Sequence, residues 1–259
     1  MSSAQQPQKT FVEVGGHRLE VERLAGDSRR PTLVFLHEGL GSVSLWKDFP
    51  ASVAAGTGCP AVVYSRYGYG QSDLLEVPFA VDYMHREALA TLPDLLATLG
   101  IRRPVLVGHS DGASIALMHA GSRDDLTGLV ALAPHVFVED ISVKSIAEAK
   151  TAFETTDLPQ KLARHHADAR RTFYAWNHIW LHPDFRRWNI EAFLPAIRCP
   201  VLAIQGADDE YGTMGQVETI ERQVGGPCEI VRLAACGHSP HRDQPELTLA
   251  AIERFVAVL

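Results

Sequence analysis

The 259-residue chain has few of the features that mark several protein classes. It holds only four cysteines and no C-x-x-C pair, so we expect neither a disulfide framework nor a thiolate metal site. These cysteines are Cys59, Cys199, Cys228 and Cys236. No apolar run approaches the roughly 20 residues that cross a bilayer. No lysine and arginine cluster suggests a nucleic-acid surface, and the net charge of −7 argues against one.

The first ten residues, MSSAQQPQKT, are polar and lack the apolar core of a secretory signal. Unpaired cysteines suit a reducing compartment, so we expect a cytoplasmic protein that binds neither membrane nor nucleic acid. Hydrophobic residues make up 46% of the chain, which is enough for a buried core of one or two domains.

Short apolar runs alternate with stretches of helical period. The runs have glycine or proline close by and suit strands buried on both faces of a parallel sheet. They cover residues 32–36, 61–64, 105–107, 126–133, 201–204 and 230–233. The helical stretches cover residues 45–55, 84–99, 113–120, 214–223 and 247–256. Ahead of them, residues 11–14 and 18–23 flank two glycines and predict a hairpin. The pattern predicts an α/β fold with a mostly parallel central sheet flanked by helices.

The alternation is interrupted once, over residues 135–197. This segment has helical pieces at 143–155 and 158–169, no clear strand, and three of the four tryptophans. We predict a helical cap over the carboxyl edge of the sheet, with residues 1–134 and 198–259 forming the core. A separate helical bundle is the alternative, and the absence of a linker-like stretch argues against it.

A serine lies between two glycines in Gly108-His109-Ser110-Asp111-Gly112, after an apolar run and before a helical one. This is the G-x-S-x-G pattern of a nucleophile on a sharp strand-to-helix turn. Glycine at both ends removes steric clashes around the strained turn, and the helix N-terminus favours negative charge beside it. Ser110 could instead be an ordinary helix cap.

A serine nucleophile needs a base and an acid that orients the base, which in such sheets follow later in the chain. Asp209 follows the run 201–204, and His238 follows the last run. Asp208 and His241 are the alternatives for these two roles. The three expected catalytic residues are thus Ser110, Asp209 and His238.

The negative oxygen that forms during attack on a carbonyl needs hydrogen-bond donors. We expect one donor to be the backbone amide of Asp111, the residue after the nucleophile. The other should come from the loop after the run 32–36, with Gly39 as first choice and Leu40 as second. Loss of one such donor typically costs about 2.7–4 kcal/mol of transition-state stabilisation.

The chain resembles the α/β-hydrolase superfamily over nearly its whole length. The matching motifs are GHSDG, HEGLGS, SRYGYGQSD, GADD and CGHSPHRDQP. The resemblance implies a cofactor-free serine hydrolase core with a helical cap. It is similar to the branch that contains carboxylesterases, lactonases, C–C bond hydrolases and valacyclovir-hydrolase-like enzymes.

Two residues depart from the usual family pattern. Glu38 stands where relatives carry glycine after the loop histidine, and Asp111 is acidic where many carry Met, Leu or Gln. The valacyclovir-hydrolase-like enzymes are similar in placing acidic groups near the site, which suits a cationic substrate. In the favoured alternative, Asp111 interacts with the helix dipole and Glu38 with loop amides or Arg66.

Further candidates for substrate binding come from the cap and the serine turn. Aromatic residues of the cap can form its own core or line a pocket. We take Glu38, His109, Trp176 and Trp180 as candidate substrate-binding residues. We expect no metal, because His, Cys and carboxylates show no ligand spacing, and the family resemblance implies no cofactor.

The sequence therefore predicts a serine hydrolase that cleaves a small carboxylic ester or lactone. A thioester or the C–C bond of a vinylogous diketone are alternative substrates for the same residues, and lyase or perhydrolase chemistry is a third possibility. A ligand receptor with little turnover is the alternative of another class. The expected partner is a small-molecule substrate, and the protein is expected to be a monomer or homodimer.

Overall fold

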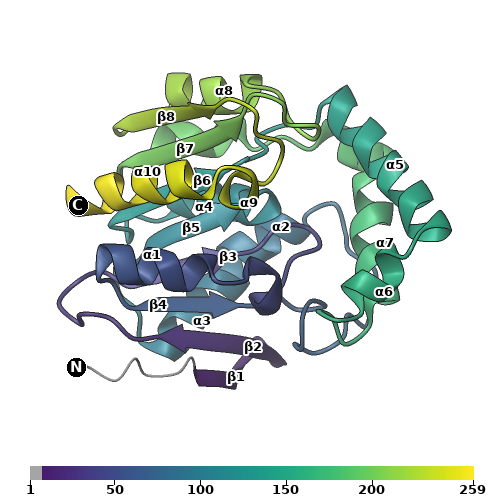
Figure 1. The fold of residues 1–259 in the computed structure, drawn as a ribbon, viewed down its shortest axis with the longest axis horizontal. Helices are drawn as coiled ribbons and strands as arrows, with labels where there is room; N and C mark the ends of the chain where they lie inside the picture. Colours follow the sequence, from purple (N-terminus) through teal and green to yellow (C-terminus); the bar gives the residue numbers. More distant parts are fainter. Residues whose placement is uncertain (1–7) are drawn as a thin grey trace.

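A computed structural model describes residues 8–259. An eight-stranded sheet runs through its centre in the order β1-β2-β4-β3-β5-β6-β7-β8 (Figure 1). The strands are β1 (Gln8–Val14), β2 (His17–Leu24), β3 (Leu33–Leu36), β4 (Ala61–Tyr64), β5 (Val105–His109), β6 (Gly128–Leu132), β7 (Val201–Gly206) and β8 (Cys228–Leu233). From β4 to β8 all neighbours pair in parallel. The predicted hairpin is the antiparallel pair β1–β2, and β2 also pairs antiparallel with β4.

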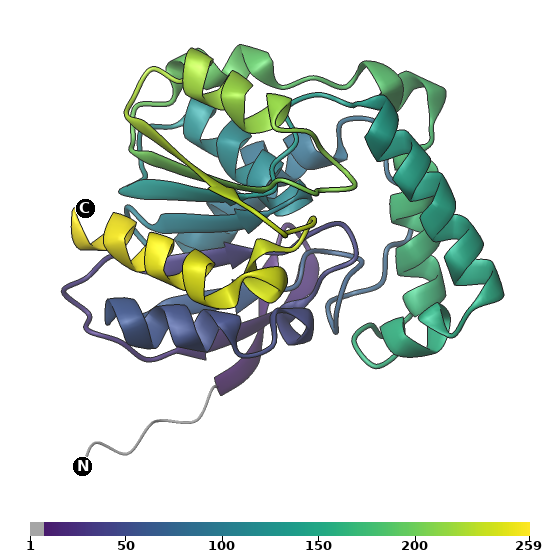
Figure 2. The ribbon, with the colours of Figure 1, turned by 45° about the horizontal axis from the view of Figure 1, so that its top comes forward.

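Every residue of β3, β4, β5, β6 and β7 is buried, as continuous apolar runs require when helices cover both faces of a sheet. The core helices are α1 (Phe49–Thr57), α2 (Tyr83–Arg86), α3 (Leu92–Leu99), α4 (Asp111–Ser122), α8 (Gly215–Gln223), α9 (Pro240–Asp243) and α10 (Pro245–Ala257). A π-helical turn, Glu87–Thr91, joins α2 to α3. Helices α1 and α10 pack on one face of the sheet and α3, α4 and α8 on the other (Figure 2). Each face has its own apolar core. The predicted α/β-hydrolase fold is confirmed.

Between β6 and β7 the chain forms α5 (Asp140–Thr155), α6 (Leu158–Leu162) and α7 (Ala169–Trp180). Two 3-10 turns follow, Pro183–Arg187 and Glu191–Ala196. Helices α5, α6 and α7 stand at one end of the sheet, outside the two helical layers (Figure 1). The division into a core and a cap at residues 135 and 197 stays a prediction.

The expected helix over residues 158–169 is wrong, because α6 ends at Leu162 and α7 begins at Ala169. Tertiary hydrogen bonds hold the intervening turns. His166 accepts the Gly70 amide proton at Nδ1, 2.9 Å away, and donates from Nε2 to the Leu40 carbonyl, also at 2.9 Å. The Ala167 amide donates to the Gly70 carbonyl. These contacts with distant loops outweigh the local helical pattern.

None of the helices in residues 8–259 combines the length and apolarity that a bilayer crossing requires.

Candidate active site

Ser110 lies on the turn between β5 and α4, with φ 52° and ψ −117°. A positive φ is strained for a residue with a side chain, and such strain is typical of functional turns. A Cβ at position 108 would overlap the backbone of Gly112 and Ala113, and a Cβ at position 112 would overlap that of Leu36. Glycine is therefore required at both ends of the motif. The Ser110 side chain makes no capping hydrogen bond to α4, which argues against its being a simple helix cap.

The hydroxyl of Ser110 points instead at the imidazole of His238. Ser110 Oγ lies 2.9 Å from His238 Nε2, and His238 Nδ1 lies 2.9 Å from each carboxylate oxygen of Asp209. The structure thus brings the three expected catalytic side chains into one hydrogen-bonded line from three strand ends. Such a line lets the imidazole accept the serine proton while the carboxylate holds the ring.

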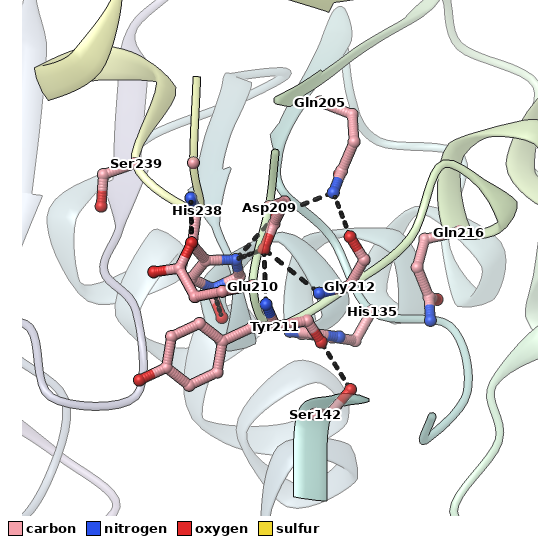
Figure 3. Close-up of polar contacts among 12 residues, drawn as sticks. His135, Ser142, Gln205, Asp209, Glu210, Tyr211, Gly212, Gln216, His238 and Ser239 are labelled. Atoms are coloured by element: carbon pink, nitrogen blue, oxygen red, sulfur yellow. Dashed lines mark hydrogen bonds and ion pairs between the residues drawn. The ribbon is translucent and has the colours of Figure 1, made fainter. Parts of the chain in front are cut away.

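Asp209 is fixed by donors other than His238 (Figure 3). Its Oδ1 accepts from the backbone amides of Tyr211, at 2.8 Å, and Gly212, at 3.1 Å. Its Oδ2 accepts from the Gln205 side-chain amide at 2.7 Å. Burial alone would raise the pKa of Asp209, but the hydrogen bond and charge of His238 and the Tyr211 amide lower it. The carboxylate therefore stays ionised beside His238.

The loop that carries His238 is held at its main chain as well. The His238 amide donates to the Glu210 carboxylate at 3.2 Å, and its carbonyl oxygen lies 2.7 Å from His109 Nε2. The two residues considered as alternatives for the acid and the base, Asp208 and His241, make neither of these contacts. Asp208 is exposed, whereas His241 is buried and packs against the ring of Trp46, 4.9 Å away between centroids.

The expected oxyanion donors lie around the same cavity. A cavity of about 240 Å³ is lined by residues that include Gly39, Leu40, Ser110, Asp111 and His238. Asp111 is the first residue of α4, where a backbone amide has no partner within the helix. Within residues 8–259, the amides of Gly39 and Leu40 donate to no protein acceptor. Both loops thus keep amides available at the cavity.

The cap segment contributes three apolar side chains to this cavity, Ile146, Trp176 and Trp180. Trp176 packs so closely on the loop after β3 that a Cβ at position 39 would overlap its indole. Other aromatic residues of the segment form stacked pairs with one another. Phe173 stacks on Phe153 and Phe185 on Trp188, with 3.9 and 5.5 Å between ring centroids.

The two unusual carboxylates both have partners inside the protein. Asp111 Oδ2 accepts from the Tyr83 hydroxyl at 2.7 Å and lies 3.7 Å from Arg66 Nη2. Burial raises the pKa of Asp111, while Arg66 and Tyr83 act against that shift. Glu38 Oε2 lies 3.4 Å from His109 Nδ1. These pairings favour internal roles for both acids over direct recognition of a cationic substrate.

Several residues of the site were missed in the sequence. His135 lines the cavity next to Trp180 and His238, with ring centroids 5.1 and 5.5 Å away. It is 2% exposed, its Nδ1 has no partner in residues 8–259, and burial lowers its pKa to about 3. Glu210 and Tyr211 also line the cavity. The sequence signal for these residues was their position, because His135 comes one proline after the apolar run 126–133 and the other two directly follow Asp209.

Across residues 8–259, no three His, Cys, Asp or Glu side chains are grouped so that they could hold a metal ion.

Comparison with known proteins finds a sequence relative and solved structures with a similar fold. The sn-1-specific diacylglycerol lipase ABHD11 of Mus musculus is 24% identical over 267 residues, covering 92% of this chain and 85% of the relative. The haloalkane dehalogenase DbeA of Bradyrhizobium elkani shares the fold with a TM-score of 0.78 at 19% identity, over 98% of both chains. The enol-lactonase of Burkholderia xenovorans shares it with a TM-score of 0.76 at 18% identity, over 96% of this chain and 100% of the other.

A family model, described as the alpha/beta hydrolase family, matches residues 33–251. This match spans most of the sheet and the whole of the site. The chain belongs to the alpha/beta hydrolase family.

Proposed function

We propose that this protein is a serine hydrolase that cleaves a small carboxylic ester or lactone through an acyl-enzyme intermediate. The observation that carries the proposal is the line Ser110–His238–Asp209, with 2.9 Å at each hydrogen bond. A serine hydroxyl becomes a competent nucleophile when an oriented imidazole can take its proton.

In this mechanism His238 Nε2 accepts the proton of Ser110 while Oγ attacks the substrate carbonyl carbon. The carbonyl oxygen becomes an oxyanion, which the amides of Asp111 and Gly39 stabilise. Asp209 stabilises the imidazolium, and His238 then gives its proton to the leaving alkoxide. Water, deprotonated by His238, attacks the acyl-enzyme and releases the acid and free Ser110. No cofactor takes part.

The cavity supports a small substrate. Its volume of about 240 Å³ lies below the range of about 300–1,000 Å³ typical of drug-sized ligands. We infer that the segment 135–197 acts as a cap, since Ile146, Trp176 and Trp180 provide the apolar wall opposite Ser110. The names of a lipase relative and an enol-lactonase neighbour support ester or lactone chemistry.

The test is turnover of a panel of p-nitrophenyl, aryl, amino-acyl, lactone and thioester substrates by the wild type and by Ser110→Ala. We expect multiple turnovers by the wild type and a loss of about 10⁶-fold in kcat in the variant, as for other serine triads. A fluorophosphonate should label the wild type at Ser110 and leave Ser110→Ala unlabelled.

Other outcomes would identify the alternatives. If thioesters or vinylogous diketones are preferred, the proposed roles of Ser110, His238 and Asp209 stand and only the bond that is cleaved differs. Labelling of Ser110 with no more than one turnover per protein would favour a receptor. Equal rates in wild type and Ser110→Ala would contradict the proposal.

A further inference from the structure

A second carboxylate–imidazole pair lies directly behind Ser110. Glu38, in the loop after β3, places Oε2 3.4 Å from Nδ1 of His109, the last residue of β5. Nε2 of the same ring lies 2.7 Å from the carbonyl oxygen of His238. The His109 side chain is 1% exposed and that of Glu38 is 19% exposed. The pair therefore links the loop after β3 to the main chain of the proposed catalytic base.

The hydrogen-bond partners of His109 determine how many protons the Glu38–His109 pair carries. A carbonyl oxygen only accepts hydrogen bonds, so His109 Nε2 must carry a proton to bind the His238 carbonyl. A neutral imidazole carries one proton, which leaves Nδ1 as an acceptor facing a carboxylate. A hydrogen bond between Nδ1 and Oε2 therefore needs one more proton, and the pair as a whole is then neutral.

Within the pair, Glu38 is the group whose ionised form the surroundings favour. Although burial alone would raise the pKa of Glu38, the hydrogen bond and charge of His109 hold it well below its usual range. The other titratable or charged groups near the pair are His37, His135, His166, His238, His241 and Arg66. Burial lowers the pKa of His241 to about 3 and that of His37 well below its usual value, so both are neutral near pH 7.

The loop sequence makes room for this pair. A Cβ at position 41 would overlap the Glu38 carboxylate, so the glycine there allows the side chain to fold back toward His109. The Glu38 carbonyl, in turn, accepts from Arg66 Nη2 at 3.0 Å and from the Gly41 amide at 3.0 Å. Both the main chain and the side chain of Glu38 are thus fixed, which suits a structural partner of His109.

We propose that Glu38 and His109 are positioning residues for His238: the glutamate keeps a proton on both nitrogens of His109, and His109 fixes the main chain of the catalytic base by donating to its carbonyl. This inference rests on the proposed function, in which His238 moves the proton of Ser110. It assigns a role to the glutamate that replaces the family's usual glycine.

The neutrality of the pair also matters for the reaction. The rings of His109 and His238 lie 5.3 Å apart between centroids, and His238 becomes an imidazolium during catalysis. Without its glutamate, a cationic His109 would repel the imidazolium of His238. A neutral His109 could carry its proton on Nδ1 instead, and would then lose the hydrogen bond to the His238 carbonyl. Glu38 prevents both outcomes.

The experiment uses four single variants of the full chain and one double variant. Glu38→Leu removes the carboxylate, Glu38→Gln keeps an amide that can donate to Nδ1 and so retain the proton on Nε2, and His109→Phe removes the donor. The matched control is Asp125→Leu. Asp125 Oδ1 lies 3.1 Å from Nε2 of buried His119, whose Nδ1 lies 3.2 Å from the Ala88 carbonyl, away from the cavity.

Kinetics should separate positioning from substrate binding. We expect Glu38→Leu and His109→Phe to lower kcat on p-nitrophenyl esters by about 10–100-fold, by analogy with the outer groups that orient ligands at metal sites. KM should change little, and the pH dependence of kcat/KM should shift. The loss of kcat should be markedly smaller in Glu38→Gln. The double variant Glu38→Leu/His109→Phe should have a kcat no lower than that of His109→Phe alone. Asp125→Leu should keep wild-type kcat.

A direct readout of the proton does not depend on turnover. In protein labelled with ¹⁵N-histidine, both His109 nitrogens should show protonated shifts in the wild type, with the signals assigned by their loss in His109→Phe. In Glu38→Leu one nitrogen should become unprotonated.

The inference is overturned if either nitrogen of wild-type His109 is unprotonated, if a folded Glu38→Leu keeps wild-type kcat, or if only KM changes. Failure of the proposed function gives a different result, because wild-type protein would then neither hydrolyse esters nor react with a fluorophosphonate. If the wild type is labelled without turnover, the labelling rates of the same variants replace kcat.

Discussion

At the residue scale, Asp209 combines two tasks in one carboxylate. It holds His238 Nδ1 with both oxygens and also orders the loop after β7 through the amides of Tyr211 and Gly212. All of these partners are donors, and so is the Gln205 side-chain amide at Oδ2. An ionised carboxylate satisfies them because it only accepts hydrogen bonds. The low pKa of Asp209 follows from the same set of contacts.

We expect Asp209→Asn to lower kcat by about 10⁴-fold while the protein stays folded, because an amide can present its own donor to Nδ1 and favour the wrong tautomer of His238. Ester hydrolysis by purified variant and wild type measures the change. Asp208→Asn is the matched control, since Asp208 is exposed. A loss of less than tenfold in Asp209→Asn would show that Asp209 does not orient the base.

At the scale of elements, the site depends on where parallel strands end. The loops after β3, β5, β6, β7 and β8 each contribute residues to the cavity, and α7 closes it with Trp176 and Trp180. Ligands bind at this edge of open α/β sheets because adjacent strand ends meet there. Helix α4 starts immediately after Ser110, so its N-terminal amides and positive dipole end lie beside the place where negative charge would develop in the proposed reaction.

The close approach of α4 to β3 can be tested with Gly112→Ala. The added Cβ would overlap the backbone of Leu36, so α4 must move away from β3. We expect a loss of about 1–3 kcal/mol in the free energy of unfolding, as for other overpacked sites, with a fall in kcat from the displaced Asp111 amide. Urea denaturation and ester kinetics measure the two effects.

Gly121→Ala is not a suitable control for that experiment, because its Cβ would also meet backbone, at Phe193. Gly16→Ser is better, since no atom lies within 4 Å of its Cβ, although its φ of +82° carries a local backbone cost. Unchanged kcat in Gly112→Ala would contradict the expected link between this helix start and the reaction.

At the scale of the whole molecule, several histidines are buried in neutral form. His37 is completely buried, His135 is 2% exposed and His241 is 5% exposed. Burial lowers the pKa of His135 and of His241 to about 3, and that of His37 well below its usual value. The unfolded chain binds protons at these residues near pH 6.5, whereas the folded protein does not.

The free energy of unfolding should therefore fall as the pH drops below about 6.5, by about 1.4 kcal/mol per pH unit for each such histidine. His241→Phe removes one of these contributions and keeps an apolar ring next to Trp46. Between pH 7 and pH 5 the variant should lose about 2 kcal/mol less stability than the wild type.

Chemical denaturation at both pH values measures that difference. Comparison of two proteins is necessary because burial raises the pKa of Glu87 and of Asp111, and a raised carboxyl pKa makes the folded state relatively more stable at low pH. These acids are the same in both proteins. An equal loss of stability in wild type and variant would mean that His241 is protonated in the folded state.

The sequence by itself determined the fold class, the strand and helix order and the turn around Ser110. The reason is that these features rest on local patterns. Apolar runs of three to eight residues specify buried strands, and the steric need for glycine at positions 108 and 112 is set within one turn. The order of Ser110, Asp209 and His238 along the chain then followed from which loops leave the same sheet edge.

Only the tertiary structure decided which polar groups pair across that edge. Glu38 and His109 are 71 residues apart and His109 and His238 are 129 apart, and neither pairing has a local sequence signal. The same holds for His166, whose bonds to Gly70 and Leu40 end the helix expected over residues 158–169. Buried polar groups have no water to bind, so they must form hydrogen bonds with other groups of the protein. Which distant groups come within reach is decided only when the molecule is packed.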